Sequence, residues 1–319
     1  MPASDPSFAP LARWIEDAGG HVRGLDLQPC RMGPALVRGL VATAPATAGT
    51  SLLAVPLSRA LRDDHVPEAY PGAPWTASMA AYLIQEAEKG AASAWAPYLA
   101  TLPDAAALAS EGGAASSSSS SDGGDAGMLS LSDVEVEEVQ YAPAVAALRA
   151  YRAQGRRAYD DWRPAGSAAA ASCSWERFAL ALHLVQSRTI RLAIMGCRVM
   201  IPGIDCLNHG GSAGATGTLA LGSSSWSVGG ERTVNFVTTR DVAAGEQVLW
   251  TYGDRSSEDF FAYHGFVLPD NPQEEAQLWG SVGEMVAWFC RERSAEDAAG
   301  RLLAAAASFP ACPAFDSAL

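Results

Sequence analysis

The feature that most constrains the fold is an apolar run that ends in polar side chains, at residues 201–210. It reads Ile-Pro-Gly-Ile-Asp-Cys-Leu-Asn-His-Gly, so a stretch that is buried at its start delivers Asp205, Asn208 and His209 together at its exit. A carboxylate, an amide and an imidazole in one place indicate a site rather than a linker. We therefore expect the fold to be built around this segment.

A second segment offers the partner for this site. Residues 245–253 read as a turn and a strand that ends at Tyr252, and a short predicted helix follows, closed by residues 264–266, His-Gly-Phe. This segment supplies a phenol, where the first supplies the other polar groups. We expect the two segments to meet around one small-molecule cofactor.

The composition limits the classes of function. A chain of 319 residues, 49% of them hydrophobic, can bury a sizeable core in one large or two modest domains. Its net charge of −13 argues against a nucleic-acid partner and suits a cationic protein substrate. No run approaches the ~20 apolar residues of a membrane span, and the first residues lack the layout of a secretory signal. We expect an intracellular monomer without a membrane partner, placed first in the cytoplasm, with the nucleus and the plastid left open.

The cysteines argue against a structural metal. None of the six forms a C-x-x-C pair, as a zinc cluster would require. They are typical of buried thiols in a reduced intracellular protein. We expect no metal ion at the site.

Near the N-terminus, the pattern predicts one helix and two strands. Apolar residues recur at helical spacing over residues 11–18, before a pair of glycines. A glycine-rich turn region follows. Residues 35–43 and 51–55 then read as two strands, and the loop between them, with a proline and a glycine, predicts that they pair as a hairpin.

This strand-loop-strand pattern occurs twice. Residues 239–249 repeat the pattern of residues 43–53, each with a loop that ends in Ala-Gly. Two similar segments so far apart suggest one β-domain assembled from both ends of the chain, although a match this short leaves chance as the alternative.

The middle of the chain reads as helical. One helix is predicted with Thr76 as its cap, one over residues 134–157, and one with Ser174 as its cap. Residues 111–127, rich in Ser, Gly and Asp, predict a disordered loop, and residues 164–172 a second loop. The positions expected to be buried on the three helices are Met79, Ala80, Leu83, Ile84, Ala87, Val139, Val145, Leu148, Tyr151, Trp175, Phe178, Leu182 and Val185.

Strands return after the first segment of the site. Residues 232–238 and 247–252 read as strands, and Ser257 as the cap of a short helix that ends at Gly265. From residue 272 onward the pattern is helical. The expected fold class is mainly β with a helical insertion, an α+β protein.

Taken in order, these segments resemble the SET-domain protein methyltransferases. The resemblance is to the branch typified by the Rubisco large-subunit lysine methyltransferase and the actin-histidine methyltransferase, and it covers about residues 11–270. An Asn-His pair alone would be weak, whereas five stretches in the order of the family are specific. They are residues 38–56, 95–103 (Trp-Ala-Pro-Tyr-Leu-Ala-Thr-Leu-Pro), 178–188, 201–209 and 245–266.

The resemblance implies a SET-domain fold of short β-sheets with a knot-like cofactor site. It implies a SET domain over residues 11–270, with a helical insertion at 76–175 that includes the disordered residues 111–127. Residues 271–319 would form a short helical C-terminal segment in place of the family's larger substrate-binding domain.

The resemblance also implies S-adenosylmethionine as the cofactor. Asn208 and His209 would hold it, Gly39 and Leu40 would lie against it, and Arg188 would reach its carboxylate. From the residues alone, Arg188 could instead form a surface salt bridge, Asn208 could cap a loop, and Gly39 could serve an ordinary turn. His209 could be a core histidine. The other residues expected around the cofactor are Asp205, which could instead only stiffen its turn, Cys206, Leu207, His264, Gly265 and Phe266.

Tyr252 matches the catalytic tyrosine of the family, although it could be an ordinary half-buried strand residue. Methyl transfer is an in-line displacement that needs aligned reactants and no water. A lysine acceptor, with an ordinary pKa of ~10.4, must first lose its proton, and an apolar channel favours that loss. Tyr252, Phe236, Trp250 and Phe266 are the candidates for its walls.

The function implied first is that of an S-adenosylmethionine-dependent protein-lysine N-methyltransferase acting on a non-histone protein. His264 stands where many members have tyrosine. This departure leaves two alternatives open, a protein-histidine N-methyltransferase and a non-catalytic SET-fold binding module.

Overall fold

The structure is a computed structural model that describes residues 4–109, 127–165, 168–223, 231–274, 278–279 and 281–292. The chain divides between Gln273 and Glu274 into two units. The first unit holds all the described strands, and the second holds one described helix, α11 (Val282–Glu292), within the tail predicted to be helical. The domain limits given above remain predictions.

Strands from both ends of the chain build four small sheets. They are β1 (His21–Val22), β2 (Leu25–Met32), β3 (Ala35–Ala42), β4 (Ser51–Pro56), β5 (Leu61–Arg62), β6 (Thr189–Leu192), β7 (Cys197–Met200), β8 (Asn208–His209), β9 (Gly217–Ser223), β10 (Arg232–Thr238) and β11 (Leu249–Trp250). The largest sheet has the order β1-β4-β10-β9, and all its pairs are antiparallel. The others are β5-β7-β6, the hairpin β2-β3 and the parallel pair β8-β11.

The predicted pairing of the first two strands is wrong. β3 and β4 lie in different sheets, because β3 pairs with β2 and β4 pairs with β1 and β10. β2 was not predicted, because Pro29 interrupts the pattern of a strand. Proline is tolerated in β2 because this strand pairs on one side only. Gly33, with a φ of 58°, makes the tight turn between β2 and β3.

The two similar segments predicted from the sequence do lie side by side. Ala46 and Val242, at equivalent places in the two loops, exchange backbone hydrogen bonds of 2.9 and 2.8 Å. The N–H of Gly49 donates to the carbonyl of Thr238 at 2.8 Å, and the equivalent bond from Gly245 measures 2.7 Å. Both glycines have a positive φ, 84° and 83°. One β-domain assembled from the two ends of the chain is therefore confirmed.

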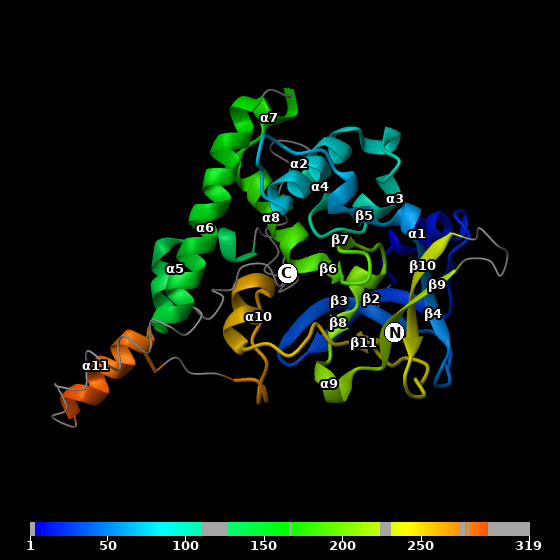
Figure 1. Cartoon of the computed structure of the whole chain (residues 1–319). Coiled ribbons are helices and arrows are strands. Elements are labelled where there is room, and N and C mark those ends of the chain that lie inside the picture. The colour runs from blue at the N-terminus through cyan, green and yellow to red at the C-terminus, as the bar shows by residue number, and fades with distance from the viewer. Residues whose placement is uncertain are drawn as a thin grey trace. The chain divides into compact units, whose positions relative to one another are not determined.

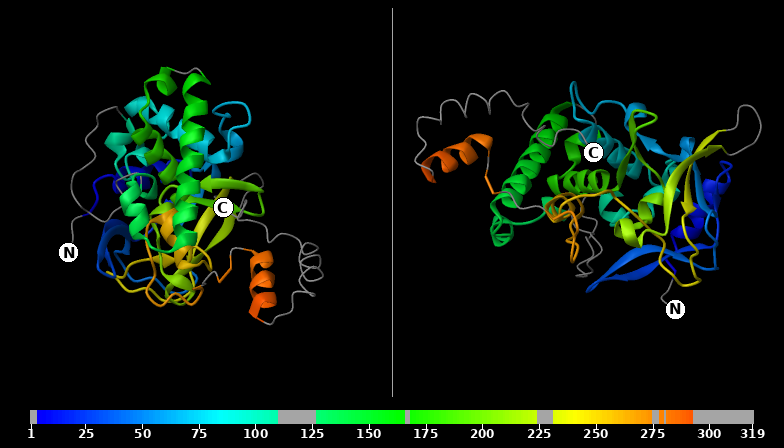
Figure 2. Two further views of the ribbon diagram at one scale, coloured as in Figure 1. Left: turned by 90° about the vertical axis from the view of Figure 1, so that its left-hand side faces the viewer. Right: turned by 60° about the horizontal axis from the view of Figure 1, so that its bottom comes forward.

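Most of the helical insertion lies to one side of the strands, as both figures show (Figures 1 and 2). All five positions predicted to be buried on the first insertion helix are buried in α2 (Trp75–Glu88), and Ser174 caps α8 (Trp175–Arg188) as predicted. The α-helices before α11 are α1 (Phe8–Glu16), α2 (Trp75–Glu88), α3 (Ala96–Leu99), α4 (Ala105–Ala109), α5 (Asp133–Glu138), α6 (Ala142–Trp162), α7 (Ala168–Ser172), α8 (Trp175–Arg188), α9 (Gly211–Gly214) and α10 (Ser257–His264). Short 3₁₀ turns are η1 (Leu57–Arg59), η2 (Asp63–His65), η3 (Gly90–Ala92), η4 (Gly127–Leu129), η5 (Arg163–Ala165) and η6 (Ile204–Cys206).

Several helix boundaries differ from the predictions. The single helix expected over residues 134–157 is two, α5 and α6, which are separated at Gln140, where φ is 58°. Pro74 and Ser256 occupy the cap positions expected at Thr76 and Ser257. The loop expected at residues 164–172 contains η5 and α7, and the predicted disordered loop lies outside the described residues except for its last residue.

The main core lies between the insertion helices and the sheets. α2 and α8 pack against each other, and Trp162 of α6 stacks on Phe178 of α8 with ring centroids 5.0 Å apart. A second, smaller cluster joins Val136, Val145 and Leu148 of α5 and α6 to Ala262 of α10. The insertion thereby supports α10, which carries part of the predicted site. None of the described helices is long and apolar enough to cross a membrane.

Candidate functional site

The parallel pair β8-β11 brings the two predicted segments together. Asn208 lies opposite Leu249, and His209 lies opposite Trp250. Beyond the pair, the N–H of Tyr252 donates to Nδ1 of His209 at 2.9 Å. The two segments, some forty residues apart in the sequence, therefore lie in direct contact.

The phenol of Tyr252 also points back to the first segment. Its hydroxyl donates to the carbonyl of Leu207 at 2.8 Å. Burial raises the pKa of this phenol far above its ordinary value, so the hydroxyl keeps its proton at neutral pH. An ordinary half-buried strand tyrosine would not need to meet the other segment in this way.

Aromatic rings surround Tyr252. The ring of His209 lies 5.2 Å away and that of His264 5.1 Å away, while Phe266 stacks on Phe260 at 5.0 Å. Gly265, with a left-handed φ of 79°, ends α10 as predicted and lets the chain turn back toward these rings.

Of two residues predicted to line the acceptor channel, one lies in the ring cluster and the other does not. Trp250 lies 5.7 Å from Tyr252 and belongs to the ring cluster. Phe236 does not: it is fully buried in β10, an inner strand of the four-stranded sheet. Alternation along the strand marked Phe236 as buried, but it could not separate a core position from a site position.

Both histidines of the cluster are neutral at pH 7. Burial lowers the pKa of His209, and its Nδ1 accepts the bond from Tyr252, so the proton resides on Nε2. Burial lowers the pKa of His264 to about 3, and Arg255, His183 and His209 act in the same direction. The backbone of Ser187 acts in the opposite direction, but burial outweighs it.

Arg188 and Asp205 form the charged part of the site. Nη1 of Arg188 donates to the main-chain carbonyl of Asp205 at 2.8 Å and lies 3.7 Å from its Oδ2. The Asp205 side chain is 1% exposed, and burial raises its pKa although Arg188 opposes the shift. Nε of Arg188 is buried without a hydrogen-bond partner. Arg188 is thus not a surface salt bridge, and it has a donor left for a ligand.

Gly39 allows a close approach to the first segment. Nδ2 of Asn208 donates to the carbonyl of Arg38 at 2.9 Å. A Cβ on Gly39 would lie 2.5 Å from that nitrogen and 2.6 Å from Nε2 of Gln247, which is itself buried without a partner. Leu40, fully buried, accepts a backbone bond from Val248 at 2.8 Å.

Cys206 and Leu207 complete the first segment. Both are buried, and burial raises the pKa of the Cys206 thiol to about 12, with Asp205 acting in the same direction. Direct contacts therefore link Gly39 to Asn208, Arg188 to Asp205, and His209 through Tyr252 to His264 and Phe266. Their roles toward a ligand remain predictions.

Sequence reasoning missed three residues of this region. Tyr98 donates to Asp205, Gln247 faces Gly39, and Phe260 lies 4.7 Å from His209. Phe260 could have been found, since it stands four residues before His264 on one helix face. Tyr98 lies in the stretch 95–103 and Gln247 in the segment 245–253, but no local pattern placed either side chain at the site, because only the tertiary fold brings them here.

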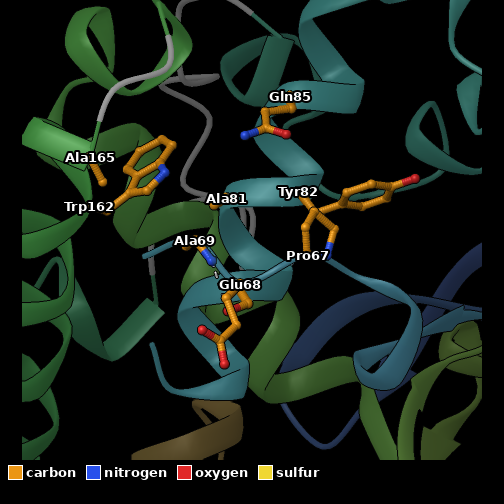
Figure 3. A pocket seen from close by; sticks show the side chains of 9 residues that line it. Pro67, Glu68, Ala69, Ala81, Tyr82, Gln85, Trp162 and Ala165 are labelled. Atoms are coloured by element: carbon orange, nitrogen blue, oxygen red, sulfur yellow. Dashed lines mark hydrogen bonds between the residues drawn. The ribbon is translucent and has the colours of Figure 1, made fainter. Parts of the chain in front are cut away.

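Two cavities lie away from these residues. One, of about 280 Å³, is bounded by the segment 57–66, Tyr82, Trp95 and Glu231. The other, of about 80 Å³, lies between the segment 67–69, α2 and Trp162 (Figure 3). Tyr82 borders both, and no residue that lines either one is a predicted site residue.

One group of possible metal ligands occurs in the described part of the chain. Atoms of Asp63, Asp64 and Cys197 lie within 4.8 Å of one another. Asp64 is held by Arg62, and Asp63 accepts from the backbone of Arg198 at 2.9 Å. Burial also raises the pKa of Cys197, which keeps the thiol protonated. These bonds account for the cluster without an ion.

Solved structures share this arrangement of elements. The SET domain of LSMT bound to lysine and AdoHcy superposes with a TM-score of 0.62 and 18% identity, over 84% of this chain and 58% of that one. Rubisco LSMT bound to sinefungin and monomethyllysine gives a TM-score of 0.65 and 16% identity, over 92% and 64%. The chain has the SET-domain fold. No protein-family model and no curated protein sequence matches it.

The predicted α+β SET-domain fold is therefore confirmed. At this low identity, the similarity bears on the fold alone. The SET-domain chain spans about 57% to 64% of the length of the LSMT chains.

Proposed function

We propose that this SET-domain chain is an S-adenosylmethionine-dependent protein-lysine N-methyltransferase that acts on a non-histone protein. The observation that carries the proposal is the contact between Tyr252 and the segment 205–209, which unites the predicted catalytic and cofactor residues. The solved structures of similar fold, bound to AdoHcy or AdoMet and in some cases to lysine or methyllysine, support it.

The residues present fit this cofactor. Its carboxylate would find an unpartnered donor in Nε of Arg188, and a second unpartnered donor is present at Gln247. Both donors are buried, and a ligand that accepts a hydrogen bond from each of them would satisfy them. Asn208 and His209 would hold the cofactor with Leu207 and Cys206, and Gly39 and Leu40 would lie against it.

The bound cofactor supplies the methyl group on a sulfonium carbon. The residues of the chain must orient the acceptor and exclude water. The hydroxyl of Tyr252 donates its hydrogen bond to the carbonyl of Leu207. Its oxygen can therefore accept a hydrogen bond from an N–H of an incoming amine. The rings of His209, Phe260 and Phe266 keep this region apolar.

The charges of the region favour an uncharged acceptor. Arg255 lowers the pKa of His264, whose ring lies 5.1 Å from that of Tyr252, so a positive field reaches the region where the acceptor would lie. Deprotonating an unperturbed lysine at pH 7 costs roughly 4–5 kcal/mol. Both the field and the burial would reduce that cost by destabilising the ammonium form.

The same observation favours one alternative. A histidine side chain is largely neutral at pH 7 and would enter beside His264 without losing a proton. We therefore retain protein-histidine N-methylation as the second candidate, and a non-catalytic binding module as the third. The monomeric state and the compartment remain predictions.

Transfer of a labelled methyl group separates these candidates. The protein is incubated with methyl-labelled S-adenosylmethionine and a protein extract, and the labelled residue is identified by mass spectrometry. Label on lysine supports the proposal, and label on histidine supports the alternative. Binding of S-adenosylhomocysteine without any transfer in any extract would indicate the non-catalytic module.

A further inference from the structure

One of the stretches that carry the resemblance, residues 95–103, has no part in the function proposed above. It contains α3 and the turn that follows. Within it, Tyr98 is fully buried, and its hydroxyl donates to Oδ2 of Asp205 at 2.8 Å. A buried hydroxyl from the insertion thus reaches a buried carboxylate of the predicted cofactor site, 107 residues further along the chain.

Asp205 in turn fixes Arg188. The main-chain carbonyl of Asp205 accepts from Nη1 of Arg188, and its carboxylate lies 3.7 Å from the same atom. Burial raises the pKa of Asp205, whereas the hydrogen bond from Tyr98 lowers it. Tyr98 therefore favours the ionised carboxylate, which attracts the guanidinium. Nε of Arg188 remains without a partner.

The same stretch also reaches the other half of the site. The hydroxyl of Thr101 donates to the carbonyl of Tyr98 at 2.7 Å, and the carbonyl of Thr101 accepts from Arg38 at 2.8 Å. The carbonyl of Arg38 accepts from Nδ2 of Asn208 at 2.9 Å. Hydrogen bonds thus connect Asp205 to Asn208 through α3 and its turn, outside the cofactor residues themselves.

We propose that Tyr98 is a positioning residue that holds Asp205, and through it Arg188, so that the guanidinium presents its donors to the carboxylate of S-adenosylmethionine. This inference rests on the proposed function. Tyr98 acts only through Asp205 and Arg188. Its loss therefore weakens recognition of one chemical group of the ligand, the carboxylate, rather than the whole ligand.

A buried tyrosine can also be purely structural, and the chain offers a matched control. Tyr159 is 3% exposed, and its hydroxyl donates to the carbonyl of Cys173 at 2.7 Å, away from the predicted site. Tyr159→Phe removes a comparable buried bond without touching Asp205 or Arg188. Both variants leave a buried acceptor unsatisfied, so we expect both to lower the melting temperature.

The test is calorimetric titration of the full chain with S-adenosylhomocysteine and with its decarboxylated analogue. We expect the wild type and Tyr159→Phe to prefer S-adenosylhomocysteine. Tyr98→Phe should bind S-adenosylhomocysteine about ten-fold more weakly, because a bond to a charged group is lost. Its affinity for the decarboxylated analogue should change less than about two-fold, since that ligand does not use the guanidinium.

Every other result would overturn either the role of Tyr98 or the proposed function. Equal weakening of both ligands by Tyr98→Phe, or an unchanged preference, would overturn the role of Tyr98. So would a wild type that binds both ligands equally well. A wild type that binds neither would instead overturn the proposed function. If Tyr98→Phe does not fold, Thr101→Val tests the same connection, with an expected loss of preference of about two- to three-fold; an unchanged preference there overturns the proposal.

Discussion

At the scale of single residues, the site combines neutral and shielded groups with one buried charged pair. Tyr252, His209 and His264 are all uncharged at pH 7, whereas Arg188 and Asp205 carry the charge. The charged groups and the neutral groups suit two different tasks. A charged pair suits recognition of an anionic group, and neutral polar groups suit an acceptor that must arrive without a proton.

The variant Tyr252→Phe tests the role of the neutral groups of the site. Removing the hydroxyl takes away the group that would orient the acceptor nitrogen, so we expect turnover to fall by about 10²–10³, by analogy with the loss of a positioned donor. Binding of S-adenosylhomocysteine should be retained. Steady-state methyl transfer and calorimetry measure the two effects. Tyr82→Phe, at the distant cavity, serves as the control, and full turnover in Tyr252→Phe would remove this residue from the mechanism.

His264 should also affect stability as a function of pH. Its folded pKa of about 3 lies below the unfolded value of about 6.5, so the unfolded state binds the proton more readily in that window. The wild type therefore loses stability through this group as the pH falls from about 6.5 toward 3. We expect His264→Gln to lose less between pH 7 and pH 4 in urea unfolding. An identical pH dependence in the two proteins would show that His264 is not shielded.

At the scale of elements, the arrangement depends on a two-residue parallel pair and on the helix that follows it. β8 and β11 are too short to be stable alone, so their register depends on side-chain bonds such as that from Tyr252 to His209. The position of α10 depends on α5 and α6, which bury Val136, Val145 and Leu148 against it.

Leu148→Ala tests that support. Leu148 is fully buried between α6 and its neighbours, so we expect a loss of about 2–5 kcal/mol in the free energy of unfolding. Val134→Ala is the control, since Val134 is 72% exposed and should change stability by less than about 0.5 kcal/mol. Urea unfolding measures both. Equal, small effects would mean that the second cluster does not stabilise the fold.

What the sequence could predict at this scale follows from how local each signal is. Helical periodicity predicted α2 and α8, and the Ser-capped start of α8 and the glycine end of α10 were correct to the residue. Strand pairing is not local: β3 and β4 were found, but their partners were not. The bond from Tyr98 to Asp205 spans 107 residues, and no spacing rule could have suggested it. Placing the site segments needed the resemblance as well as the pattern.

At the scale of the whole molecule, the predicted site residues all lie in the unit that ends at Gln273. Within this unit, late segments of the chain pair with early ones. β10 pairs with β4, and the two similar loops are hydrogen-bonded to each other. The site is formed by both ends of this unit, and residues beyond it supply none of the predicted cofactor contacts.

A truncated chain of residues 1–273 should therefore keep its affinity for S-adenosylhomocysteine within about two-fold, as a ligand contacts only groups that remain. Calorimetry on the truncated and the full chain makes the comparison, with circular dichroism to verify that the shorter chain is folded. A folded truncation that has lost binding would show that the second unit contributes to the cofactor site.

The central claim is that Arg188, the segment 205–209 and Tyr252 line one cofactor site. A crystal structure of the full chain with S-adenosylhomocysteine tests it most directly. We predict the ligand carboxylate within hydrogen-bond distance of Arg188, with its sulfur on the side of Tyr252. A ligand bound elsewhere, such as in the cavity bounded by the segment 57–66, Tyr82 and Trp95, with Arg188 and Tyr252 untouched, would contradict the account.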